Sequence, residues 1–174
     1  MAVPGIAHLS GWDNFYVIVG SSAGALIGLQ FVVMTLIAGD RRATNKSISA
    51  FGTPTVIHFS ATLLIAAMLS APWESIAGLR AALGIFGAIG VAYAVRVTLH
   101  AMQQNIYEPV LEDWIFYSVL PFACYALLFV AAFLLVGNIS VALFLIATVA
   151  LGLMFIGIHN SWDTVTFLVL KKDD

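Results

Sequence analysis

The chain runs from Phe15 to Ala38 without a charged side chain, and this feature limits most strongly how it can fold. A helix needs about 20 mostly apolar residues to cross the hydrocarbon layer of a membrane. The whole composition agrees, because 61% of the residues are hydrophobic and only 9% are charged. Soluble domains carry about 25% charged residues. The sequence therefore predicts a protein that spans a membrane.

Further apolar runs follow, and together they predict an all-α, polytopic bundle of five membrane-spanning helices. The second run begins at Pro54, and a proline is tolerated in a first turn because its missing N–H would have no partner there. Gly137 and Asn138 form a tight turn between the fourth run and the fifth. The predicted spans make up one transmembrane domain over residues 1–174, at about 15–38, 54–71, 76–101, 114–136 and 139–170.

The fifth run is longer than a membrane requires. A helix from Ile139 to Leu170 is about 48 Å long, against a hydrocarbon thickness of about 30 Å. The helix must tilt steeply, project from the membrane or break. These three alternatives stay open, and a break would be expected within 159–163, because Asn, Ser and Asp side chains compete for backbone hydrogen bonds. In the fourth span, Pro121 predicts a kink.

The distribution of Lys and Arg predicts the orientation, because cytoplasmic loops carry an excess of both. Of the 7 such residues, only Arg80 falls on the side of the N-terminus. We therefore predict a multi-pass protein of the plasma or inner membrane, with its N-terminus outside and its C-terminus inside. The residues on the inner side are Arg41, Arg42, Lys46, Arg96, Lys171 and Lys172.

Several classes of function lack support in the sequence. The net charge is −2 and there is no basic tract, so no nucleic-acid partner is predicted. The single cysteine, Cys124, cannot form an intramolecular disulfide. We find no glycine-rich phosphate loop, serine triad or paired catalytic carboxylates, and therefore predict no catalytic residue.

Glycines mark predicted packing faces on two of the spans. Within lipid, small residues allow helix backbones to approach closely. Glycines spaced by four on the first span share one face, as in a glycine zipper, and glycines spaced by three on the third span suggest a second contact. Such seams join helices within a subunit or between the subunits of a homo-oligomer. The glycines are Gly20, Gly24, Gly28, Gly84, Gly87 and Gly90.

Polar residues inside the spans are the candidates for a functional site, because they are costly in lipid and face a bundle interior or water. They form one stripe on the second span and one on the fifth, and Gln30 adds a polar group to the first. The second span contributes Thr55, His58, Thr62 and Ser70, and the fifth contributes Thr148, His159, Asn160 and Asp163.

Three interpretations of these stripes remain open. His58 and His159 could form hydrogen bonds between helices, with Asp163 capping a helix break. The stripes could instead line a permeation path gated by His–Asp pairs. Finally, a transition metal or haem could bind to His58, His159, Asp163 and His100, although the sequence has no HExxH or CxxCH motif.

We therefore predict a small homo-oligomeric channel or transporter for ions or small solutes that needs no cofactor. In this hypothesis the polar stripes of the second and fifth spans line the path. One alternative is a membrane redox protein that binds a metal or haem through histidines of the inner leaflet. Another alternative is a non-catalytic subunit of a larger membrane complex.

Overall fold

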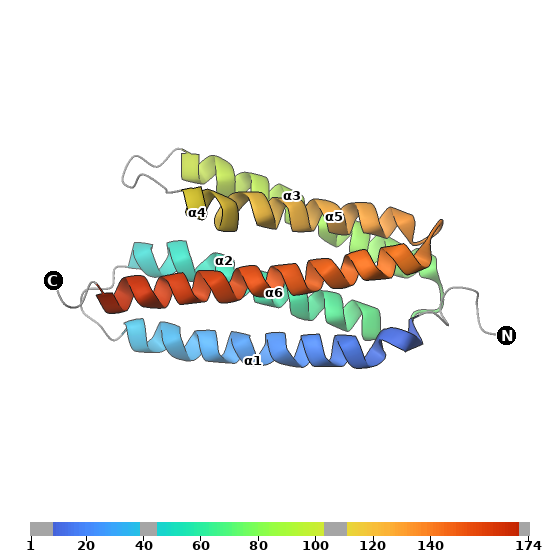
Figure 1. Ribbon diagram of the computed structural model, residues 1–174, viewed down its shortest axis with the longest axis horizontal. Coiled ribbons are helices and arrows are strands. Elements are labelled where there is room, and N and C mark those ends of the chain that lie inside the picture. Colours follow the sequence, from blue (N-terminus) through green and yellow to red (C-terminus); the bar gives the residue numbers. More distant parts are fainter. Residues whose placement is uncertain (1–8, 39–44, 103–110, 171–174) are drawn as a thin grey trace.

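The computed structural model describes residues 9–38, 45–102 and 111–170. Five long helices run side by side along one axis, and the start of α1 and the end of α6 lie at opposite ends of the bundle (Figure 1). No strand occurs in the described ranges. The five helices are long and apolar enough to cross a membrane. Four of them are α1 (Asp13–Ala38), α2 (Asn45–Ser70), α3 (Ile76–Met102) and α6 (Ile139–Leu170). The other runs over Leu111–Leu134 and combines the one-turn helix α4 (Leu111–Trp114), a π-helical turn and α5 (Leu120–Leu134).

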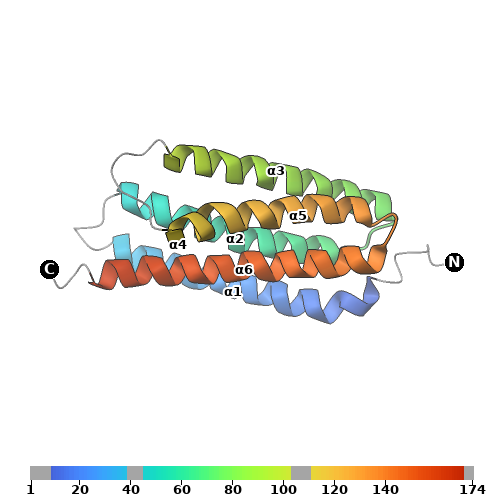
Figure 2. The same cartoon turned by 45° about the horizontal axis from the view of Figure 1, so that its top comes forward.

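The helices α2 and α6 form the centre of the bundle. The helix α1 packs on α2, α2 packs on α6, α6 packs on α5, and α5 packs on α3 (Figures 1 and 2). In the most apolar segment of α2 and of α6, 50% of the residues are buried, against 17% for α1 and 22% for α3. Polar residues on the facing sides of α2 and α6 are therefore enclosed within one chain.

Glycine allows the closest of these helix contacts. A Cβ atom at Gly20 of α1 would lie 3.0 Å from the Cβ of Ala66 in α2. At Gly87 it would lie 2.8 Å from the backbone nitrogen of Phe129. At Gly90 it would overlap the buried ring of Tyr125. These three glycines lie where two helices meet, and Gly84 lies in ordinary contact distance of α5.

The other predicted packing glycines lie in open surroundings. A Cβ atom at Gly24 or Gly28 would meet no atom within 4 Å among the described residues. The glycine face of α1 is therefore used for close helix packing only at Gly20.

The second helix begins earlier than the sequence predicted. The helix α2 starts at Asn45, and Pro54 lies inside it, so the prediction that Pro54 occupies the first turn is wrong. Proline inside a helix removes one backbone hydrogen bond, but membrane helices tolerate this where their surroundings satisfy the freed carbonyl. The apolar segment of α2 spans Thr53–Ser70, close to the predicted span, and the preceding turns extend the same helix.

Of the three alternatives for the last helix, the structure excludes a break. The helix α6 is continuous over its 32 residues. The residues that suggested a break make contacts with other helices instead of ending their own. Ser161 donates a hydrogen bond to Gln30 of α1, and Asp163 accepts one from Tyr117. At about 1.5 Å per residue, a continuous α6 is longer than a hydrocarbon layer of about 30 Å, so in a membrane it would tilt or project.

A π-helical turn replaces regular α-helix just before Pro121. This turn, Ile115–Val119, joins α4 to α5, and the N–H of Leu120 donates to the carbonyl of Ile115. The wider turn gives room for the proline ring, which in a regular helix would clash with the carbonyl of Tyr117. The sequence predicted a kink here, and the π turn is the local distortion that the structure shows.

Part of the charge pattern used to predict orientation cannot be placed. Arg41, Arg42, Lys171 and Lys172 lie outside the described residues, as does the side chain of Lys46. Within the described part, Arg96 and His100 lie near the C-terminal end of α3, and Arg80 lies near its start.

The glycine contacts give a direct test of this packing. We expect Gly90→Ala to lower the free energy of unfolding by about 1–3 kcal/mol, because the methyl group overlaps the Tyr125 ring. Gly24→Ala is the matched control, and it should leave stability unchanged or raise it slightly, since its methyl group meets open space. Thermal unfolding in detergent measures both. Equal destabilisation by the two variants would contradict the packing.

Candidate functional site

Two polar contacts join α6 to the segment before α5 at one end of the bundle. The Nε2 atom of His159 lies 3.1 Å from the Oε1 atom of Glu112. The imidazole also stacks on the Phe116 ring, with centroids 3.5 Å apart and planes at 4°. One turn further along α6, Tyr117 donates a hydrogen bond of 3.4 Å to Asp163. The cluster reaches the surface at Glu112, and its other four side chains are partly buried. We call these five residues the mouth.

The π-helical turn explains how Phe116 and Tyr117 take part. Both residues lie within the wide turn, and both contact α6. Pi turns inside helices are frequent at functional sites, since they redirect side chains that a regular helix would point elsewhere. Pro121 thus influences the mouth through the π turn that holds Phe116 and Tyr117, and its position in the sequence did not indicate this.

Next to the mouth, buried amide and hydroxyl groups meet at the junction of α1, α2 and α6. Gln30 of α1 is 4% exposed, and its Oε1 atom accepts a 3.0 Å hydrogen bond from Ser161. Asn160 of α6 is fully buried at 0% exposure. Thr55 of α2 is also fully buried. We call Gln30, Thr55, Asn160 and Ser161 the polar layer.

The register of α2 against α6 places Thr55 level with Asn160. Thr62 donates to the carbonyl of Ala150, at 3.1 Å, and the Phe59 ring packs on Gly157. Since the two helices are antiparallel, these contacts fix which residues lie at equal depth. Each of the three helices therefore brings a buried polar side chain to the same layer.

The polar layer contains hydrogen-bonding groups that the described residues leave unused. A buried donor or acceptor without a partner costs about 1–3 kcal/mol, so native proteins contain few of them and each requires an explanation. In the described part of the chain these buried atoms are the Oη of Tyr16, the Nε2 of Gln30, the Nδ1 of His159, and both the Nδ2 and Oδ1 of Asn160. All except Tyr16 belong to the mouth or the polar layer.

One turn further into the bundle, His58 of α2 pairs with Tyr125 of α5. The His58 Nδ1 atom and the Tyr125 hydroxyl are 3.2 Å apart, and each residue is 1% exposed. The Tyr125 ring rests on Gly90, and the Phe86 ring meets it edge-on. Beyond this pair, Thr62 donates to the carbonyls of His58 and Ala150.

The other half of the central contact is apolar. Beyond Thr62, α2 presents Ile65 and Leu69 to the interior, and α6 presents Leu143 and Ile146, all 3% exposed or less. The hydroxyl of Tyr16 in α1 is buried towards that end and has no hydrogen-bond partner among the described residues. Polar groups therefore extend from the mouth to about the middle of the α2–α6 contact, and an apolar segment follows.

The predicted site residues thus divide into two groups. Ser70 and Thr148 are exposed, and the hydroxyl of Thr148 bonds to its own helix at Phe144. The structure brings the others together in or beside the mouth and the polar layer. These are Gln30, Thr55, His58, Thr62, His159, Asn160 and Asp163.

Sequence reasoning missed several residues of this site. Tyr125 was not among the predicted site residues, but a tyrosine hydroxyl inside a span needs a partner, and that requirement could have singled it out. No sequence pattern indicated that Ser161, Phe116 or Glu112 belongs to the site. Their contacts depend on the continuity of α6 and on the π turn.

The candidate metal ligands are not assembled. In the described residues, no group of three or more His, Cys, Asp or Glu side chains could hold a metal ion. His58 contacts Tyr125, and His159 contacts Glu112. His100 is exposed near the end of α3.

Comparison with known proteins adds no assignment, because no protein-family model, curated protein or solved structure matches this chain. The functional argument therefore depends on the contacts themselves.

A double-mutant cycle tests the contact between His58 and Tyr125. We expect His58→Leu and Tyr125→Phe to show a coupling of about 0.5–1.5 kcal/mol in unfolding free energy, because they remove the same buried hydrogen bond. Chemical unfolding in mixed micelles provides the four stabilities. Strictly additive effects would show that the two side chains do not interact.

Proposed function

We propose that this protein moves a small polar solute or a cation across a membrane, along a path inside its own bundle. The observation that supports this most strongly is Asn160, a fully buried amide with no partner for either polar atom in the described chain. Polar groups in a membrane interior are expensive and commonly serve a substrate path. The polar layer is the place where we propose that the transported species binds.

The mouth supplies the entrance in this proposal. His159 and Asp163 flank Asn160 on α6, so a species that passes the mouth reaches the polar layer within one helical turn. Among the described residues that flank the entrance, Glu112, Asp113 and Asp163 bring three carboxylates, and His159 brings an imidazole. These carboxylates favour a cation or a neutral polar solute over an anion.

The apolar segment beyond Thr62 supports a transporter more than an open channel. Ile65, Leu69, Leu143 and Ile146 leave no polar lining for a continuous wet path. Passage then requires α2 and α6 to separate on that side, so that the polar layer opens to each face of the membrane in turn. The buried members of the two stripes, Thr55, His58, Thr62 and Asn160, lie inside one chain, so the proposed path needs no central axis of a homo-oligomer.

We further propose that the mouth opens to the cytoplasm, with the N-terminus of the chain outside. Support comes from Arg96 and His100 near the C-terminal end of α3, at the same end of the bundle as the mouth (Figure 1). Basic residues concentrate on the cytoplasmic side of membrane proteins.

Flux through liposomes that contain the purified protein tests the proposal. Suitable probes are the proton, Na⁺ and K⁺ with entrapped indicators, and glycerol and urea by light scattering. We expect at least one probe to cross faster than in empty liposomes, and Asn160→Leu to slow it by tenfold or more. The leucine variant should remain folded, because it removes unpaired buried groups that cost about 1–3 kcal/mol.

The matched control is Thr148→Val on the same helix. Thr148 is exposed and bonds only to its own backbone in the described contacts, so its loss should leave the flux unchanged. The proposal fails if no probe exceeds the rate of empty liposomes, or if Asn160→Leu transports as fast as the unaltered protein.

A further inference from the structure

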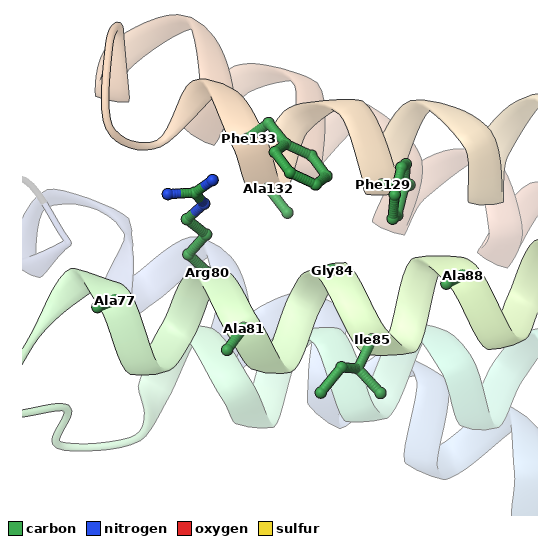
Figure 3. Close-up of a pocket in the computed structure, with 9 residues that line it drawn as sticks. All are labelled: Ala77, Arg80, Ala81, Gly84, Ile85, Ala88, Phe129, Ala132 and Phe133. Atoms are coloured by element: carbon green, nitrogen blue, oxygen red, sulfur yellow. The ribbon is translucent and has the colours of Figure 1, made fainter.

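A groove runs between α3 and α5 at the end of the bundle opposite the mouth (Figure 3). Its volume is about 470 Å³. Small residues of α3 form most of its floor, and Ile85 also lines it. The small floor residues are Ala77, Ala81, Gly84 and Ala88, and Ala77, Ala81 and Ala88 are exposed. The groove is therefore open to the surroundings of the bundle, which in a membrane are lipid.

Aromatic rings form the opposite wall. Phe129 and Phe133 of α5 stand beside the groove, 38% and 51% exposed, and contact each other edge-on with ring centroids 4.9 Å apart. Figure 3 shows the side chain of Arg80 rising from α3 towards Phe133. The lining is thus apolar along its length and carries one positive charge at one end.

Among the described residues, the charge of Arg80 has no counter-ion. Its guanidinium lies 5.1 Å from the centre of the Phe133 ring, and no described carboxylate forms an ion pair with it. Arg80 is the fifth residue of α3, which places it about 6 Å from the start of the helix. At this depth an arginine reaches the headgroup region by extending its side chain towards the interface.

We propose that this groove binds one phospholipid with an anionic headgroup. The phosphate lies against the Arg80 guanidinium, which can donate two hydrogen bonds to it. One acyl chain lies along the floor of small residues, beside Phe133 and Phe129. From Arg80 to Ala88 the floor is about 12 Å long, most of the roughly 15 Å that one leaflet of hydrocarbon occupies.

Both parts of the groove are needed for this assignment. The apolar floor and the aromatic wall fit an acyl chain, and the unpaired cation fits a phosphate. Zwitterionic lipids carry the same phosphate, but their own cation offsets its attraction to Arg80. A net negative headgroup is therefore preferred. This site is separate from the polar layer and does not depend on the proposed transport.

Native mass spectrometry of the purified full chain tests the proposal. The protein is exchanged into micelles that contain phosphatidylglycerol or phosphatidylcholine with identical acyl chains. We expect one lipid to remain bound, with a preference of about fivefold for phosphatidylglycerol, the size expected of one arginine near the surface. Arg80→Gln should abolish this preference. Ala81→Phe fills the floor and should weaken both lipids alike.

Two matched variants of the same helix serve as controls. Arg96→Gln removes an exposed cation near the other end of α3, and Ala92→Phe adds the same ring at an exposed position outside the groove. Both should bind lipid as the unaltered protein does. The proposal is overturned if the unaltered protein shows no headgroup preference, or if Arg96→Gln lowers it as much as Arg80→Gln. It is also overturned if a second copy of the chain occupies the groove, seen as a dimer that Ala81→Phe dissociates.

Discussion

The contact between α2 and α6 determines how the rest of the bundle is arranged. It is fixed at one point by the hydrogen bond from Thr62 to the carbonyl of Ala150 and at another by the Phe59 ring on Gly157. Lipid offers no hydrogen bonds, so polar side chains on these helices must face each other or another helix. With this register, Asn160 and Thr55 lie at one level, where Gln30 also reaches α6 through Ser161. The outer helices α1 and α3 are less buried and present most of their surface outward.

The spans could be predicted from the sequence because length and hydropathy alone decide what crosses a bilayer. The helix ends were harder to predict. Pro54 and the segment around Asn160 carry local signals for a helix start and a break, yet α2 and α6 continue through both. Tertiary contacts outweigh these local preferences, since Ser161 and Asp163 find partners on other helices. The π turn before Pro121 accommodates the proline ring. The sequence indicates that some distortion is needed there but not that it is a π turn.

The candidate site could be predicted in part. Helical spacing placed His58 and Thr62 on one face of α2, and that face is buried against its neighbours. Spacing does not indicate which helix lies opposite, so the partners Tyr125 and Ala150 could be identified only from the packing of the helices. The same limit applies to glycines, because Gly20 and Gly24 look alike in the sequence and only Gly20 touches another helix closely. The groove at Arg80 lies between α3 and α5, so it could be recognised only from the packing of these two helices.

We propose that the polar layer, which is buried in this structure, opens to water from the side of the mouth, whereas the apolar contact beyond Thr62 stays closed. The chain has 1 cysteine, Cys124, so its replacement by alanine gives a background for single cysteines at chosen depths. A small, charged, thiol-specific reagent is then applied to each side of sealed vesicles. We expect a cysteine at position 160 to react from the side of the mouth and one at position 146 to react from neither side in the closed state. Equal reaction at both positions, or none at position 160 from either side, would contradict the account.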